Sequence, residues 1–163
     1  MGDENAHPLE SRIPLPDDFV KICRELNARG AKYLVVGFAV IQHGFLRNTG
    51  DIDVLIEDSL DNQAKAKRAL EVLPDKAVLE LGDDDLRNWV VVRVCDEVVV
   101  DLMTLACGVS YQDGESEIEI HVIDGVPIPF ASAKLLLRTK QTFREKDAED
   151  RAFLGAKIAR AGK

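Results

Sequence analysis

Two aspartates, Asp51 and Asp53, stand two residues apart at the start of the apolar segment 51–57. Because side chains alternate between the two faces of a β-strand, both carboxylates of a strand here would lie on the same face. Two carboxylates side by side raise each other's pKa unless a cation lies between them. A divalent metal ion explains the pair most simply. Mg²⁺ prefers hard oxygen ligands and binds through one or two carboxylates plus substrate phosphates, so we predict Mg²⁺, with Mn²⁺ as an alternative.

A third aspartate, Asp101, follows three consecutive valines (98–100) inside another apolar segment. A charged, unpaired carboxylate in such a strand would cost on the order of several kcal/mol, so we expect it at an end of the sheet, facing a cation or a donor. One interpretation is a structural aspartate that caps a neighbouring loop. The acidic pair upstream favours the other interpretation, in which Asp101 is a third metal ligand.

A candidate phosphate-binding turn precedes the acidic pair. The pattern predicts a buried strand over 33–36, a turn at Gly37 and a short helix over 38–43. A glycine turn that leads into a helix N-terminus offers free backbone N–H groups and the positive end of a helix dipole to a phosphate. His43 lies on that helix, and we interpret it as a hydrogen-bonded structural residue in preference to a ligand.

In this order and at this spacing, these features resemble the nucleotidyltransferase superfamily that includes DNA polymerase beta. The small members look most similar: minimal nucleotidyltransferases, AbiEii-type abortive-infection toxins and antibiotic nucleotidyltransferases. In them Gly-Gly-x-Ala, His-Gly, Arg, Thr and Asp-(Ile/Leu)-Asp follow one another much as, in this chain, do Gly37, Ala39, His43, Gly44, Arg47, Thr49, Asp51 and Asp53. The family pattern also places its third carboxylate on a later strand, in a stretch like the one that holds Asp101.

The resemblance implies a Mg²⁺-dependent enzyme that moves a nucleoside monophosphate from an NTP to a hydroxyl acceptor, which would be a small molecule, a protein or a tRNA end. The three aspartates would be its catalytic metal ligands and would hold two Mg²⁺ ions about 3.5 to 4 Å apart, the arrangement for in-line displacement at phosphorus. Pyrophosphate would be released. The residues that would bind the nucleotide are Gly37, Phe38, Arg47, Thr49 and Lys140.

The small members have a similar lysine, followed by Arg-x-Lys-Asp, at the positions of Lys140 and of Arg144 to Asp147. In that comparison Lys140 would reach toward the triphosphate or the base, and Asp147 would hold the junction of two helices. For Arg144 and Lys146 a charged outer face of amphipathic helices is an equally good interpretation.

The turn departs from the family at its first position, where Val36 stands in place of a small residue. Valine disfavours the positive φ that glycine adopts, and its branches crowd an approaching phosphate. We therefore keep two alternatives to an active enzyme on small substrates. One is a catalytically weak or silent module of the same fold, and the other is a toxin-type transferase that a partner restrains.

The expected helices and strands predict an α/β (α+β) fold, and the resemblance implies a nucleotidyltransferase-like mixed central sheet of about four to six strands flanked by helices. Residues 1–16 contain three prolines and are predicted to form an extended arm ahead of one domain, 17–163. Within that domain 131–163 would form C-terminal helices, the first capped by Ser132. The other expected elements are helices over 17–29 and after Asp58 or Ser59, a weak strand over 77–81, a hairpin of 89–94 with 97–103, and a last hairpin of 118–123 with 126–129.

The composition and net charge of the chain exclude some classes of binding partner. The chain has 163 residues, 46% hydrophobic and 31% charged, and no apolar run approaches the roughly 20 residues needed to cross a bilayer, so we expect no membrane partner. Its net charge of −8 argues against extended nucleic-acid binding. Three cysteines without close spacing indicate the cytoplasm. The expected partners are an NTP, a hydroxyl acceptor, and an antitoxin or a second copy of the chain.

Overall fold

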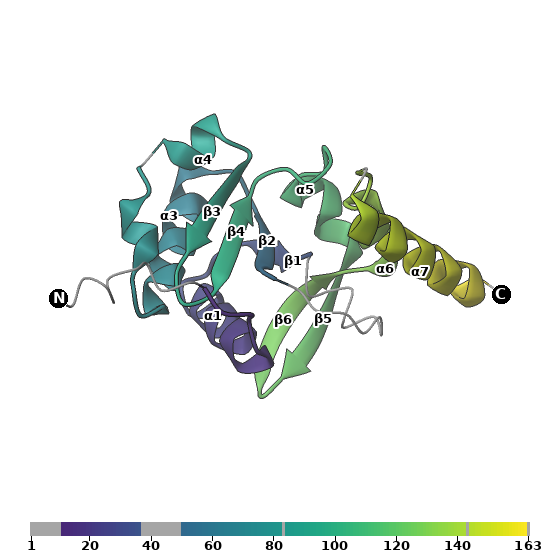
Figure 1. Cartoon of the computed structure of the whole chain (residues 1–163), viewed down its shortest axis with the longest axis horizontal. Coiled ribbons are helices and arrows are strands. Elements are labelled where there is room, and N and C mark those ends of the chain that lie inside the picture. Colours follow the sequence, from purple (N-terminus) through teal and green to yellow (C-terminus); the bar gives the residue numbers. More distant parts are fainter. Residues whose placement is uncertain (1–10, 37–49, 83, 143, 163) are drawn as a thin grey trace.

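The computed structural model describes residues 11–36, 50–82, 84–142 and 144–162. Its centre is a six-stranded sheet in the order β3-β4-β2-β1-β6-β5 (Figure 1). β2 runs parallel to β4 and β1 parallel to β6, whereas the other neighbouring pairs are antiparallel. The predicted α/β class, with a mixed sheet flanked by helices, is confirmed. The strands are β1 Tyr33–Val35, β2 Ile52–Ile56, β3 Val91–Cys95, β4 Val99–Met103, β5 Ile118–Ile123 and β6 Val126–Ala131.

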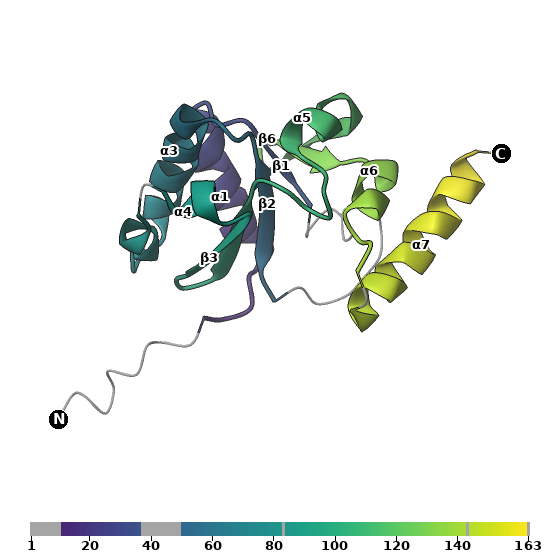
Figure 2. The same ribbon diagram turned by 90° about the horizontal axis from the view of Figure 1, so that it is seen from above.

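Helices lie on both sides of this sheet. Figure 2 shows α1, α3 and α4 on one side of the β2–β4 region, and α5, α6 and α7 on the other. The α-helices are α1 Pro16–Ala28, α3 Leu60–Ala69, α4 Asp85–Asn88, α5 Tyr111–Gly114, α6 Ala133–Arg138 and α7 Glu145–Ala161, and the short 3₁₀ helices are η2 Leu70–Val72, η3 Ala77–Glu80 and η4 Glu115–Glu117. None of the helices within the described ranges is long and apolar enough to cross a bilayer.

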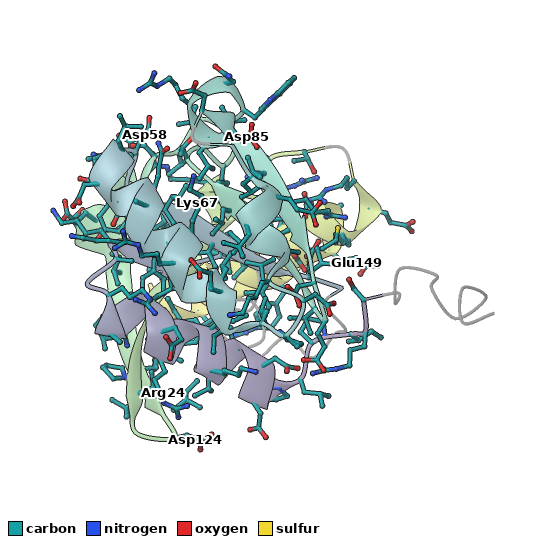
Figure 3. The ribbon with its side chains drawn as sticks, turned by 90° about the vertical axis from the view of Figure 1, so that its left-hand side faces the viewer. Arg24, Asp58, Lys67, Asp85, Asp124 and Glu149 are labelled. Atoms are coloured by element: carbon teal, nitrogen blue, oxygen red, sulfur yellow. The ribbon has the colours of Figure 1, made fainter. Side chains whose placement is uncertain are left out.

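The face of the sheet toward α1 and α3 is apolar. In β3 the alternate residues Val92 and Val94 are buried, and they are in register with Leu102 and Val100 of β4. Phe19 of α1 packs against the other half of the sheet, with its ring centroid 5.7 Å from that of Phe130. The outer sides of α1 and α3 carry charged residues, as Figure 3 shows for Arg24 and Lys67. Burial of the apolar face is the main force that orients these helices.

The opposite face of the sheet has two parts, one packed against helices and one that carries polar side chains. Near β1 it is covered tightly, because a Cβ at Gly114 of α5 would lie 2.7 Å from Leu135 of α6 and 3.3 Å from Leu34 of β1. Toward β2, β4 and β3 the same face carries Asp53, Asp101 and Arg93 in adjacent register. The polar residues therefore lie beside the part of the sheet that α5 and α6 cover.

One predicted strand is wrong, and the first strand of the predicted hairpin begins later than expected. Residues 77–80 form the 3₁₀ helix η3, not a strand, because the carboxylate of Asp96 accepts hydrogen bonds from the backbone N–H groups of Asp75 and Ala77 and so holds a tight turn there. The first hairpin strand starts at Val91, not at Trp89, which is 66% exposed and whose N–H continues α4 by bonding the carbonyl of Asp85.

The predicted caps of two helices are confirmed. The hydroxyl of Ser59 accepts a hydrogen bond from the N–H of Asn62 at the start of α3, and that of Ser132 accepts one from Leu135 at the start of α6. Ahead of α1, Arg12 donates its backbone N–H to the carbonyl of Glu97 (3.0 Å). This bond ties the extended residues before α1 to the turn between β3 and β4.

Candidate functional site

The three predicted carboxylates meet on the polar face of the sheet. β2 and β4 are paired so that Asp53 lies directly beside Asp101, and Asp51 precedes β2 on the same face as Asp53. Each of the three offers one carboxylate oxygen to a group in which all the oxygens lie within 4.8 Å of one another. Residues about 50 positions apart in the sequence are thus brought to one place by the parallel pairing of two strands.

An arginine that the sequence analysis did not single out bridges this group. Arg93 is in register with Asp101 across β3 and β4. Its Nε donates to Asp101 Oδ1 (2.9 Å), and its Nη2 donates both to Asp101 Oδ2 (3.0 Å) and to Asp51 Oδ2 (2.8 Å). Arg93 therefore supplies a cation to two of the three acids.

The turn between β3 and β4 explains why the sequence hid this contact. A two-residue turn at Cys95 and Asp96, as predicted, would place Asp101 opposite Val90. The structure instead pairs Cys95 with Val99 and leaves three residues in the turn, because Asp96 points inward and accepts backbone N–H groups. In the sequence, Arg93 lies between the apolar residues Val92 and Val94, which indicates that it points to the other face of the strand. Which residue it faces on the next strand depended on the length of the turn.

Burial and mutual repulsion disfavour full ionisation of the acids. Burial, followed by the charges of Asp51 and Asp101, raises the pKa of Asp53 to about 7, although Lys140 opposes this. Burial and Asp101 likewise raise the pKa of Asp51, against the pull of Lys146 and Arg93. Hydrogen bonding to Asp101 raises the pKa of Arg93, which stays charged. The group is therefore short of positive charge.

A cavity of about 280 Å³ adjoins Asp53. One part of its lining is apolar and comes from β3, β4 and the residues after β4, and another part is polar and comes from the junction of α6 and α7. Its lining residues are Val36, Asp53, Val90, Val91, Met103, Leu105, Ala106, Cys107, Thr139, Lys140, Thr142 and Arg144. A ligand with an apolar ring and an anionic group would find both kinds of surface here.

Lys140, predicted to bind the nucleotide, lines this cavity but is itself buried among acids. Its Nζ lies 3.3 Å from Asp150 Oδ2 and 3.9 Å from Asp147 Oδ1. Asp147 also accepts hydrogen bonds from the Thr142 hydroxyl and from Nη2 of Arg144 (2.9 Å). Burial alone would raise the pKa of Asp147, but these bonds and the nearby cations lower it. Lys140, Asp147 and Asp150, with Thr142 and Arg144, are called the junction cluster below, because they join α6 to α7.

The other predicted nucleotide-binding residues, Gly37, Phe38, Arg47 and Thr49, lie outside the described residues, as does His43. The chain approaches the predicted turn from β1. The N–H of Val36 donates to the carbonyl of Asp53 (3.1 Å), so the residue before Gly37 lies beside one of the three acids.

No protein-family model matches the chain, and no curated protein shows significant similarity to it. The predicted resemblance to nucleotidyltransferases therefore rests on the sequence motifs alone.

The acids fit the metal ion that the resemblance implies. Three carboxylates provide the hard oxygen ligands that Mg²⁺ and Mn²⁺ prefer, and they converge from two strands of a rigid sheet. Burial and crowding of like charge, which raise the pKa of Asp51 and Asp53, are the conditions that a divalent cation relieves. Arg93 holds two of the same carboxylates, so a metal ion would have to share them with its guanidinium.

Proposed function

We propose that this chain is a Mg²⁺-dependent nucleotidyltransferase that moves a nucleoside monophosphate from an NTP to a hydroxyl acceptor and releases pyrophosphate. The observation that carries the proposal is the convergence of Asp51, Asp53 and Asp101 within 4.8 Å, beside a cavity whose lining includes Lys140 and Arg144. The order of the motifs in the sequence supports the same activity.

In the proposed mechanism Asp51, Asp53 and Asp101 hold the metal ions. Bound Mg²⁺ would polarise the phosphoryl oxygens, lower the pKa of the acceptor hydroxyl and neutralise charge on the leaving pyrophosphate. Asp101 accepts two hydrogen bonds from Arg93, and we assign it the role of accepting the proton of the acceptor hydroxyl. Catalysis then consists of positioning and electrostatic stabilisation, without a covalent enzyme intermediate.

The cavity supplies the remaining requirements of an NTP. Lys140 and Arg144 bring positive charge to one part of the lining, where they would face phosphate oxygens. Val90, Val91 and Leu105 offer apolar surface to a base or to the acceptor. Gly37, Phe38, Arg47 and Thr49 complete the proposed nucleotide site by the resemblance. The three cysteines are free, which is consistent with the reducing cytoplasm in which we place the reaction.

Transfer of label tests this function directly. The purified protein is incubated with each α-³²P-labelled NTP and a panel of small alcohols, proteins and tRNA, with Mg²⁺, with Mn²⁺ or with EDTA. We expect labelled acceptor with one NTP, dependent on the metal and abolished by Asp53→Asn. Absence of labelled product under all conditions, together with NTP binding that is indifferent to Mg²⁺, would contradict the proposal.

A catalytically silent binding module is the second candidate, because Arg93 already holds two of the acids and Val36 replaces the small residue of the turn. Isothermal titration separates the two candidates. An enzyme should bind a non-hydrolysable NTP much more tightly with Mg²⁺ than without it, whereas a module whose acids are satisfied by Arg93 should bind equally in both conditions.

A further inference from the structure

We propose that Arg93 is an exchangeable counter-ion: it holds the acids when no metal is bound, and it moves to the triphosphate when metal and nucleotide enter together. This inference rests on the proposed function, since it takes the three aspartates as metal ligands. It assigns Arg93 a positioning role that couples the binding of the metal to the binding of the nucleotide.

The contacts of Arg93 are those of a substitute cation. The planar guanidinium donates to both oxygens of Asp101, and one of its nitrogens also reaches Asp51. A metal ion that takes an oxygen from these carboxylates would lie beside a fixed positive charge, in a region where burial strengthens the repulsion. The metal and the guanidinium therefore compete for the same oxygens.

Arg93 is placed so that it can leave. Its side chain is 58% exposed, although the carboxylate side chain of Asp101 that it bonds is only 8% exposed. β3 is the edge strand of the sheet, and its backbone pairing with β4 does not depend on the direction of this side chain. Rotation of Arg93 therefore breaks ion pairs without disturbing the strand.

A destination for the released side chain lies nearby. Val91, two residues earlier on the same face of β3, lines the cavity that adjoins Asp53. A triphosphate bound through a metal ion at the three acids would bring phosphate oxygens beside the guanidinium of Arg93, and an arginine binds phosphate through the same two-pronged geometry that it uses for a carboxylate. The phosphates of the nucleotide would thus give Arg93 an anionic partner in place of the carboxylates that the metal ion takes.

The exchange predicts that loss of Arg93 has opposite effects on metal binding without nucleotide and on binding of the metal–NTP complex. Without nucleotide, removal of Arg93 frees the carboxylates and should tighten metal binding. With nucleotide, the same change removes a phosphate ligand and should weaken binding of the metal–NTP complex. Because the coupling between two ligands is reciprocal, both effects must appear whichever ligand is varied. A residue that only stabilised the fold could not produce the first effect.

The test compares Arg93→Gln with Arg87→Gln. Arg87 is a matched control, because its side chain is also 58% exposed and its ion pair is with Asp84, away from the three acids. Mn²⁺ binding is followed by electron paramagnetic resonance, and Mg²⁺ with a non-hydrolysable NTP by isothermal titration. We expect Arg93→Gln to bind Mn²⁺ about tenfold more tightly, and the Mg²⁺–NTP complex about tenfold more weakly, than Arg87→Gln.

Arg93→Lys provides a second variant if the glutamine destabilises the hairpin, since it keeps the charge but loses the fork, and it should show smaller changes of the same signs. If wild type binds Mn²⁺ and Arg93→Gln binds it equally or more weakly, the exchange is overturned while the metal site stands. If wild type binds no Mn²⁺, with or without nucleotide, both the exchange and the proposed function fall.

Discussion

Two groups of acids in this protein differ in their balance of charge. In the junction cluster Asp147 and Asp150 are fully buried, and Lys140 and Arg144 lie within ion-pair distance of them. On the sheet face three aspartates lie together, and among the described residues Arg93 is the cation within ion-pair distance of any of them.

The difference indicates two uses of buried carboxylates. Among the described residues of the junction cluster, two acids are matched by two cations, and this balance suits the packing of α6 against α7. On the sheet face, by contrast, three acids share one ion-paired cation among the described residues, and burial and crowding raise the pKa of Asp51 and Asp53, so the group would gain from an added divalent cation such as Mg²⁺. We infer that the buried acids of the junction cluster serve stability, although Lys140 and Arg144 also line the cavity, and that Asp51, Asp53 and Asp101 serve ligand binding. Variants in the two groups should therefore separate activity from stability.

The largest effect is expected from Asp101→Asn. Loss of one of three metal ligands should lower the rate of nucleotidyl transfer by about 10³-fold or more, while the melting temperature stays the same or rises because one of the crowded charges is gone. The control is Asp124→Asn, an equally conservative change in the exposed turn between β5 and β6. Equal rates for the two variants in the labelled-transfer assay would contradict the assignment.

Lys140→Met tests the junction cluster. It leaves Asp147 and Asp150 buried with less compensation, and we expect the free energy of unfolding in urea to fall by about 3 kcal/mol. Lys134→Met, an exposed lysine of α6, is the control and should cost little. A Lys140→Met protein of normal stability that fails to bind NTP would instead assign this lysine to the nucleotide alone.

The pH dependence of the free energy of unfolding should report the raised pKa of Asp53. The pKa of Asp53 is about 7 in the fold and near 4 when unfolded, so its contribution to stability is present below pH 4 and is lost as the pH rises toward 7. Asp53→Asn does not titrate, and we expect it to gain about 2 kcal/mol relative to wild type between pH 5 and pH 8 without metal.

Chemical denaturation at several pH values measures this difference between Asp53→Asn and wild type. Added Mg²⁺ should stabilise wild type at pH 8 and reverse the order of the two proteins. A difference in stability that does not change with pH would show that Asp53 is ionised throughout.

Thr142→Val should give the smallest effect. Its hydroxyl donates to Asp147, which retains its bond from Arg144, so we expect a loss of about 1 kcal/mol in the free energy of unfolding and unchanged metal binding. A change in Mn²⁺ affinity in this variant would show that the junction cluster and the sheet-face acids are not independent.

The sequence was sufficient to predict the acids but not their counter-ion. The two-residue spacing of Asp51 and Asp53 requires a shared face of one strand, and the valines before Asp101 predicted a second strand that would hold a third carboxylate. Arg93 was not predicted, because its position opposite Asp101 depends on a three-residue turn set by Asp96. The backbone N–H groups of Asp75 and Ala77 donate to Asp96, and these bonds hold a 3₁₀ helix where a weak strand had been predicted. Residue spacing within one strand was thus sufficient to predict a shared face. Contacts that depend on a buried side chain distant in the sequence, such as Asp96, could not be predicted.

Diffraction from crystals grown with Mn²⁺ and a non-hydrolysable NTP tests the central claim most directly, because the anomalous signal locates the metal without assumption. The account predicts Mn²⁺ bound to carboxylate oxygens of Asp51, Asp53 and Asp101, with the triphosphate on the same ion. Mn²⁺ bound elsewhere, or a nucleotide bound without metal while Arg93 still bridges Asp51 and Asp101, would contradict it.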